Sequence, residues 1–197
     1  EGLYQLTEKI EIDSKRLDIK ELKETDTDPE LITGGYLLEI DHKRRYNETG
    51  FETKLNIPFT VKEPGKITPD QLAYIQSFIQ NVEDRIFSSE FADPNKGFAS
   101  VIDVQSFIDW YLLMELTKNN DAIFWTSVYL FKDRGGKLSM GPAWDFDIAL
   151  GNCDYNDMAN PEGWWIRKAS WYERLFQDPV FKQRVRARWN QIKPVQL

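Results

Sequence analysis

Apolar and polar residues alternate along the first third of the chain, and this alternation predicts strands. Residues 3–19, 34–41 and 48–65 carry apolar side chains close to every second position, which is the spacing of a strand with one buried face. A polar stretch, KETDTDPE, separates the first of these segments from the second. We therefore expect residues 1–66 to consist mostly of antiparallel strands.

The spacing changes to a helical period at Thr68. Thr68 can cap a helix, Pro69 suits its first turn, and Gln71 completes a capping box. Apolar residues then follow three or four positions apart, at Leu72, Ile75, Ile79, Val82 and Ile86. An apolar stripe with this spacing predicts an amphipathic helix over residues 69–88.

A second helix is predicted over residues 104–118, with Asp103 as its N-cap. Its apolar residues lie on nearly all sides, which is typical of a buried helix. Glu115 continues the apolar stripe, and a buried carboxylate needs a partner. We expect Glu115 to be largely buried and bonded to a basic side chain or to backbone donors, with a salt bridge in the core as the simplest case.

The rest of the chain predicts a hairpin followed by more helix. Residues 126–144 hold two alternating runs joined by the turn sequence DRGG. Residues 170–193 predict one or two helices, with a break at Asp178-Pro179. Together the patterns predict a single α+β domain over residues 1–197, in which N-terminal antiparallel strands precede a mostly helical region, 67–197, that contains the hairpin.

Composition and charge exclude several classes of protein. The 25 basic and 32 acidic side chains give a net charge of −7, which argues against a general nucleic-acid binder. No apolar run approaches the ~18 residues that a membrane-spanning helix needs, so we expect no transmembrane segment. One Cys and one His exclude the usual zinc clusters and an internal disulfide framework.

The stretch GPAWDFDIALGN, residues 141–152, holds the most suggestive chemistry. In an extended segment Asp145 and Asp147 face the same side, with Phe146 turned into the core. Two carboxylates this close repel each other unless a proton or a cation compensates. Mg²⁺ and Ca²⁺ prefer carboxylate oxygens, so the pair is a candidate metal site. The alternative is a solvated acidic loop.

A second polar cluster, Asn119, Asn120 and Asp121, follows the helix predicted over residues 104–118. The ordinary interpretation is a helix C-cap, because Asn tolerates the left-handed conformation. The functional interpretation brings Asp121 to the same cleft as Asp145 and Asp147, from opposite ends of the hairpin segment. Phosphoryl-transfer sites use one aspartate at the attacking hydroxyl and another at Mg²⁺. We predict that the three carboxylates converge.

The segments GGYLLEID, MELTKNNDAIFWTSVYLFKD, GKLSMGPAWDFDIALGN and DPVFKQRVRARW occur in this order, and the chain they form resembles the spore coat protein H (CotH) kinase-like family. The resemblance runs from GLYQLTEKI almost to the end of the chain. It implies an atypical protein-kinase-like fold that transfers phosphate from ATP to protein Ser or Thr with Mg²⁺. It also implies an extracytoplasmic, cell-surface or spore-coat location.

The resemblance also implies roles for single residues. Asp121 matches the catalytic aspartate, and Asp145 matches the aspartate that binds Mg²⁺ with the nucleotide. Asp147 and Asn119 match supporting polar groups, Asp147 at the metal and Asn119 at the nucleotide. Trp144 is placed to stack on adenine, although a core position is the stronger interpretation.

The chain departs from the family pattern in two ways. Family members carry an upstream segment with basic residues near the phosphates, so we expect this chain to be an excerpt that begins after it. The early cations here are Lys9, Lys15, Arg16 and Lys20, outside any phosphate-binding motif, and there is no Gly-rich phosphate loop. In addition, Ser127 stands where a kinase-like site has an Asn as a second metal ligand.

Two other functions stay open at this point. One is a non-catalytic surface or carbohydrate-binding module whose aspartates hold Ca²⁺ or only structure. Trp164 and Trp165 would then offer a surface for sugar stacking, or else simply pack. The other is a metal-dependent glycosyltransferase using the D-x-D pattern, which is disfavoured because the sequence predicts no doubly wound sheet.

Overall fold

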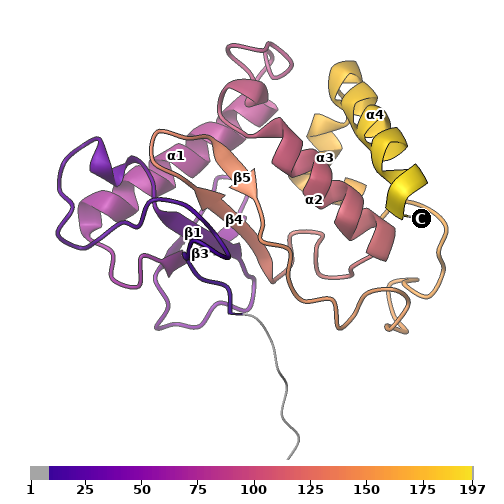
Figure 1. Ribbon diagram of the computed structural model, residues 1–197, viewed down its shortest axis with the longest axis horizontal. Helices are drawn as coiled ribbons and strands as arrows, with labels where there is room; N and C mark the ends of the chain where they lie inside the picture. Colours follow the sequence, from indigo (N-terminus) through magenta and orange to yellow (C-terminus); the bar gives the residue numbers. More distant parts are fainter. Residues whose placement is uncertain (1–8, 197) are drawn as a thin grey trace, which may run out of the picture.

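The computed structural model describes residues 9–196, and its centre is an antiparallel sheet (Figure 1). Within the described residues the strand order is β2-β3-β1-β4-β5. The strands are β1 Tyr36–Ile40, β2 Gly50–Glu52, β3 Pro58–Glu63, β4 Val128–Lys132 and β5 Leu138–Met140. The predicted hairpin forms as β4 and β5, and β4 pairs with β1. The hairpin therefore extends the sheet formed by the first third of the chain.

Both faces of the sheet are covered, and this explains why every residue of β1 is buried. Leu38 and Ile40 belong to the main core, which also contains the apolar stripe of the first long helix. Leu37 points to the other face and joins a smaller cluster with Leu17 and Tyr129. Successive side chains of a strand alternate between faces, so a strand buried on both sides shows no polar face.

The prediction of strands over residues 3–19 is wrong for the part that the structure describes. Residues 3–8 lie outside the described residues. Residues 9–19 form turns and isolated bridges, in which the Asp13 N–H donates to the Leu17 carbonyl. Ile10, Ile12 and Ile19 pack onto the cluster around Leu37. The alternating apolar residues thus cover a sheet face instead of adding a strand, and the first third contains more loop than expected.

The predicted capping box forms at the start of the first long helix, α1, Pro69–Phe87. The Gln71 N–H donates to the Thr68 hydroxyl, and the Thr68 N–H donates to the Gln71 side chain. Two N–H groups that the helix leaves free are satisfied in this way. The apolar stripe of α1 packs on the sheet, which confirms the prediction for residues 69–88 within one residue.

Of the remaining helices, the second packs against β5, the third packs against α1 and contacts β3 through an aromatic pair, and the fourth packs against the second (Figure 1). They are α2 Val104–Thr117, α3 Ser170–Leu175 and α4 Pro179–Gln196, and short 3-10 turns span Leu31–Thr33 (η1), Phe98–Ser100 (η2) and Ile166–Lys168 (η3). The Asp103 side chain caps α2, and Asp178 accepts from the first amides of α4. The break predicted at Asp178-Pro179 is confirmed. Among the described residues, no helix is long and apolar enough to cross a membrane.

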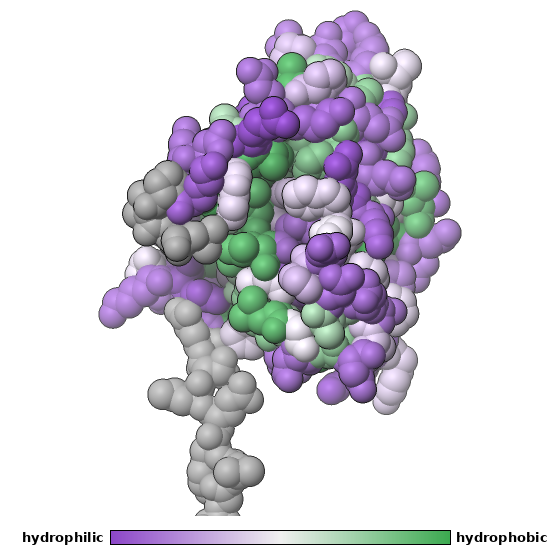
Figure 2. Space-filling view, turned by 90° about the vertical axis from the view of Figure 1, so that its right-hand side faces the viewer, coloured by the Kyte–Doolittle hydropathy of each residue, from purple (hydrophilic) through white to green (hydrophobic). Residues whose placement is uncertain are grey.

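The expectation that α2 is buried on nearly all sides is wrong at its C-terminal half. Leu113 and Leu116 are exposed, whereas Phe107, Ile108 and Met114 are buried. The helix packs against β5 on one side and α4 on another, and these neighbours leave one strip of its surface uncovered. Apolar surface gathers between hydrophilic side chains on the side of the molecule that carries α4 (Figure 2).

Candidate active site

The structure brings Asp121, Asp145 and Asp147 to one cleft of about 1010 Å³. One wall of the cleft is formed by the sheet, through residues of β1 and β3. The other wall is formed by the segment after α2, residues 120–127, and by the segment after β5, residues 144–148. Residues far apart in the sequence therefore share one solvent-filled space.

Asn119 fixes the two aspartate segments relative to each other. Helix α2 ends at Thr117, and its C-cap is Lys118, with a left-handed φ of 45°. The left-handed C-cap is therefore Lys118 and not one of the asparagines on which the C-cap interpretation rested. The buried Asn119 side chain (2% exposed) donates to the Asp145 carbonyl at 2.7 Å. Its own oxygen accepts from the Asp121 N–H at 3.2 Å. Asn119 is not among the described residues that line the cleft, so it positions both aspartates and does not face a ligand.

A chain of side-chain amides orients the Asp121 carboxylate. The Asn120 amide donates to Asp121 Oδ1 at 3.0 Å, and Asn156 donates to the Asn120 oxygen at 2.9 Å. The Trp165 indole N–H in turn donates to the Asn120 carbonyl. Asp121 Oδ2 accepts no hydrogen bond among the described residues, so one oxygen of this carboxylate is free to meet a substrate hydroxyl. The roles of Asn156 and Trp165 have no sequence signal, because they come from a loop some 40 residues away.

The backbone at Asp145 differs from the extended conformation that the sequence predicts. Asp145 has a φ of 62°, in the left-handed region, where Asp is one of the residues that fit with least strain. Phe146 is exposed instead of turned into the core, because the left-handed residue redirects the chain. Asp145 and Asp147 nevertheless both line the cleft, and the Ser127 hydroxyl donates to Asp145 Oδ2 at 2.9 Å.

The three carboxylates act on one another electrostatically. Partial burial raises the pKa of Asp145 above its usual value, and repulsion from Asp147 and Asp121 raises it further, while the Ser127 hydrogen bond opposes the rise. A cation held by Asp145 and Asp147 relieves this repulsion. Within residues 9–196, however, no three His, Cys, Asp or Glu side chains form a group that could hold a metal by themselves. Mg²⁺ is often bound by one or two carboxylates plus phosphate oxygens and water, and the pair fits that pattern.

The sheet wall carries basic residues that the sequence reasoning did not consider. Lys62 on β3 pairs with Glu39 on β1 at 3.1 Å and with Glu48 at 3.3 Å. Burial lowers the pKa of Lys62, but pairing with the two glutamates outweighs it and leaves the pKa raised. Lys43 and Arg45, in the segment between β1 and β2, also line the cleft, and none of the four early cations lies among the described residues of the cleft. One signal in the sequence could have indicated a basic partner here: Glu39 is a charged residue inside the apolar run YLLEI.

Trp144, which belongs to the predicted site, and Trp125, which the sequence reasoning did not name, both line the cleft. Trp144 lines the cleft and also packs against the cluster of Leu37 and Tyr129 on the second face of the sheet. Trp144 is therefore part of both the core packing and the cleft lining. Trp125 stacks on His42 at 4.8 Å between ring centroids and lies at the rim.

Glu115 has the backbone partners that the sequence predicts, with less burial than expected. Its two oxygens accept from the Trp165 N–H at 2.6 Å and the Arg167 N–H at 3.1 Å. The side chain is half-buried, and the described residues hold no salt bridge to it, contrary to the simplest case. Glu115 thus anchors the start of the turn η3, and with it the Trp165 ring that supports Asn120.

Removing the charge of Asp145 is expected to stabilise the metal-free protein at neutral pH. A carboxyl whose pKa is raised by folding contributes its full stability only below the unfolded pKa of about 4, and that contribution is lost as pH rises through the folded pKa. Asp145→Asn should therefore unfold at higher temperature than the wild type at pH 7 in EDTA. The gain should stay below about 1 kcal/mol, because exposed charges interact weakly in water.

The pH dependence of the stability gain of Asp145→Asn tests this prediction. The advantage of Asp145→Asn should shrink towards pH 4, where the wild-type carboxyl becomes protonated. Thermal unfolding of both proteins from pH 4 to pH 8 measures it. A variant that is less stable than the wild type at every pH would show that the Asp145 carboxylate serves structure through Ser127 instead of repelling its neighbours.

Comparison with known proteins gives one match, to a family. The family model described as CotH kinase protein matches residues 1–197, the full length of the chain. No curated protein and no solved structure matches it.

Proposed function

The chain belongs to the CotH kinase protein family, and from this premise we propose that it transfers phosphate from ATP to a protein hydroxyl in the cleft of Asp121, Asp145 and Asp147. The observation that carries the proposal is the charge arrangement of the cleft. Three aspartates and the cation Lys62, itself paired with Glu39, line the same cleft. Protein kinases likewise use a lysine held by a glutamate, together with a metal-binding aspartate, at their nucleotide phosphates.

Asp145 and Asp147 are the residues we propose for Mg²⁺. Their mutual repulsion and their exposure to the cleft favour a divalent cation. Mg²⁺ bound there would neutralise part of the charge of the nucleotide phosphates. On the opposite wall, Lys62 is proposed to contact the phosphates, and Glu39 and Glu48 hold its ammonium in place. Trp144, half in the core, offers one open side to the adenine.

Asp121 is the residue we propose for the chemical step. Its free oxygen accepts the proton of the attacking hydroxyl while that hydroxyl oxygen bonds to the γ-phosphorus and the bond from phosphorus to the departing ADP oxygen breaks. Asn120 holds the other carboxylate oxygen at 3.0 Å and so fixes which oxygen faces the hydroxyl. We propose a Ser or Thr side chain of a protein as the acceptor and an extracytoplasmic, surface or spore-coat location, both as extensions of the family assignment.

A non-catalytic binding module is the alternative that one observation favours. Ser127, at the position proposed for a second metal ligand, donates its hydroxyl to Asp145 and adds no charge to the site. In that case the aspartates hold Ca²⁺ or serve structure. Trp164 and Trp165 both line a hollow of about 810 Å³; Trp164 is exposed, whereas Trp165 is half-buried and donates to Asn120.

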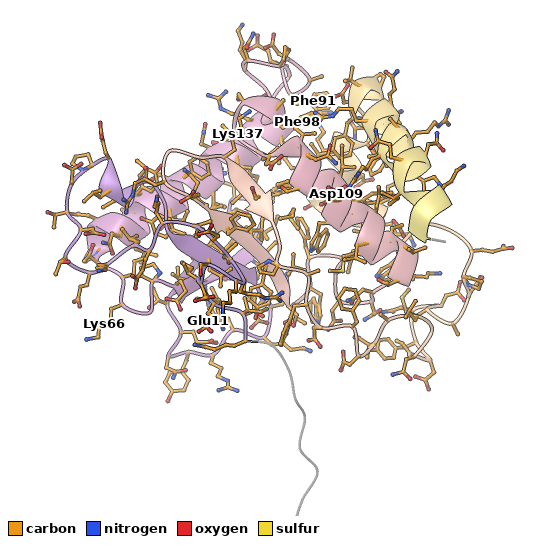
Figure 3. The ribbon with its side chains drawn as sticks, viewed as in Figure 1. Glu11, Lys66, Phe91, Phe98, Asp109 and Lys137 are labelled. Atoms are coloured by element: carbon orange, nitrogen blue, oxygen red, sulfur yellow. The ribbon has the colours of Figure 1, made fainter. Side chains whose placement is uncertain are left out.

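Binding of Mg²⁺ and ATP tests the proposal directly. The melting temperature should rise with Mg²⁺ and ATP together, since a ligand at 100 times its Kd adds about 2.7 kcal/mol of stability. Lys62→Gln should weaken ATP binding about tenfold or more, because a charge-assisted contact is lost. The matched control is Lys66→Gln, the same change at an exposed lysine that points away from the molecule (Figure 3).

The control variant distinguishes the loss of a direct contact with the phosphates from the effect of a changed net charge. Lys66→Gln should leave ATP affinity within about twofold, since a distant surface charge is screened by salt. Isothermal titration calorimetry of the three proteins, each with its own melting temperature recorded, provides the comparison. If Mg²⁺ and ATP leave the melting temperature of the wild-type protein unchanged while Ca²⁺ alone raises it, the kinase proposal is overturned in favour of the binding module.

A further inference from the structure

A second groove, of about 720 Å³, lies between α2, α4 and the loop that precedes η3. It takes in the strip of α2 that α4 leaves uncovered. No described residue lines both this groove and the aspartate cleft. A hollow of about 810 Å³, lined by both Trp164 and Trp165, lies between them. The groove is therefore a separate site from the cleft.

The groove presents large apolar side chains to solvent. Leu116 is 51% exposed and Trp164 is 59% exposed. More deeply placed apolar residues, among them Leu112, Val185 and Trp189, also line the groove. Exposed apolar patches with a polar rim are typical of interaction sites. The view onto this side of the molecule shows apolar surface between hydrophilic side chains (Figure 2).

The rim of the groove is basic, although the protein as a whole is acidic. Arg167, Lys182 and Arg186 line the groove and are exposed. Helix α4 carries five basic residues and no acidic one in a chain of net charge −7. Among the described residues, the ion pair of α4 is that of Arg188 with Asp109, which leaves Lys182 and Arg186 without an acidic partner.

Glu115, the one acidic side chain among the described residues of the lining, does not neutralise this rim. Glu115 directs both oxygens to the backbone N–H groups of Trp165 and Arg167. The Arg167 guanidinium lies over the Phe176 ring at 4.9 Å, which holds it at the groove without removing its charge. The groove thus combines an apolar floor with three cations that have no carboxylate partner among the described residues.

We propose that this groove binds an acidic peptide segment of a partner protein, anchored by one or two apolar side chains. Charge complementarity selects acidic side chains for the rim, and the apolar floor selects a Leu- or Phe-like anchor. A nucleic acid is a poorer fit, because it would meet a strongly acidic protein outside this rim. The proposal concerns binding alone and does not depend on phosphate transfer.

A labelled peptide tests the proposal on the whole chain without nucleotide. The probe is a fluorescein-tagged peptide of about 12 residues that alternates Asp or Glu with Leu and Phe, followed by fluorescence anisotropy. Arg186→Glu should weaken its binding about tenfold, the size expected for reversing one interfacial charge. The matched control is Arg184→Glu on the same helix, which lies outside the groove in a separate depression and should change the Kd less than about twofold.

A second pair of variants tests the apolar floor. Leu116→Ser should weaken peptide binding, whereas Leu150→Ser, at another exposed leucine outside the groove, should not. A control peptide with Ser in place of Leu and Phe should bind at least about tenfold more weakly. Equal losses with Arg186→Glu and Arg184→Glu, or equal binding of the two peptides, would show attraction by charge alone and overturn the proposal.

Other occupants of the groove give different results. If the protein dimerises in sedimentation and Leu116→Ser abolishes the dimer, the groove is an interface between copies of this chain. If single-stranded oligonucleotides compete with the peptide at lower concentration than the unlabelled peptide does, the site prefers nucleic acid. Either outcome contradicts the proposed partner.

Discussion

Asp121→Asn is expected to lower phosphate transfer from ATP by about 10²- to 10⁴-fold, the usual contribution of a positioned general base. The asparagine keeps the size of the side chain, and its oxygen can still accept from Asn120. It cannot take up the proton of an attacking hydroxyl at neutral pH. Transfer of labelled γ-phosphate to a mixture of Ser and Thr peptides measures the rate.

The loss should appear in the chemical step and not in nucleotide binding. Asp121→Asn should therefore bind Mg²⁺ and ATP within a few-fold of the wild type, in contrast to Lys62→Gln. Asp154→Asn is the matched control, because Asp154 is exposed and lies in the acidic loop without lining the cleft. An Asp121→Asn protein as active as Asp154→Asn would remove Asp121 from the reaction.

Trp171→Ala is expected to lower the free energy of unfolding by about 3–5 kcal/mol, the range for large-to-small changes in a well-packed core. Trp171 is fully buried and meets the Phe124 ring edge-on at 5.6 Å. Its indole N–H donates to the buried carboxylate of Glu83 at 3.4 Å. Alanine leaves a cavity and removes a donor from that carboxylate. Urea unfolding followed by circular dichroism measures the loss.

Trp171→Phe separates the two causes. Phenylalanine fills most of the volume and removes only the donor, so it should cost clearly less than alanine. Phe124 lies between Asp121 and β4 and has a left-handed φ of 66°, which packing against Trp171 helps to maintain. Trp171→Ala should therefore weaken Mg²⁺ and ATP binding in the protein that remains folded. Equal stability of Trp171→Ala and Trp171→Phe would show that packing at this position is not the main contribution.

The helical spacing of apolar residues and the capping residues predicted the helices well, because both signals lie within or next to each helix. The capping box at Thr68 satisfies backbone groups of its own helix end, and Pro179 suits the first turn of the helix that Asp178 caps. The alternating pattern of residues 9–19 gave the wrong structure for a related reason. Alternation indicates only that one side of a segment is buried. A loop that lies on a sheet face buries one side just as a strand does.

The sequence placed three aspartates at the candidate site but did not indicate the charged residues that the sheet contributes, Lys62 and Glu39. The D-x-D pattern and the polar helix end mark Asp121, Asp145 and Asp147 within short stretches. Lys62 carries no such mark, since a lysine in a strand is most often a solvated side chain. Only the pairing of β1 with β3 brings Lys62 to Glu39, and it also places both in the lining of the cleft that holds the aspartates.

The sequence by itself determined the family, the main helices, the hairpin and the acidic half of the cleft, because these follow from residues close together along the chain. The tertiary structure decided what depends on distant residues. It placed Asn119 inside the protein as a link between Asp121 and Asp145, and it gave Glu115 backbone partners 50 and 52 residues away. It also left one strip of α2 uncovered beside a basic helix. Burial, repulsion between carboxylates and open grooves arise only when segments from several parts of the chain pack together, and no local pattern encodes them.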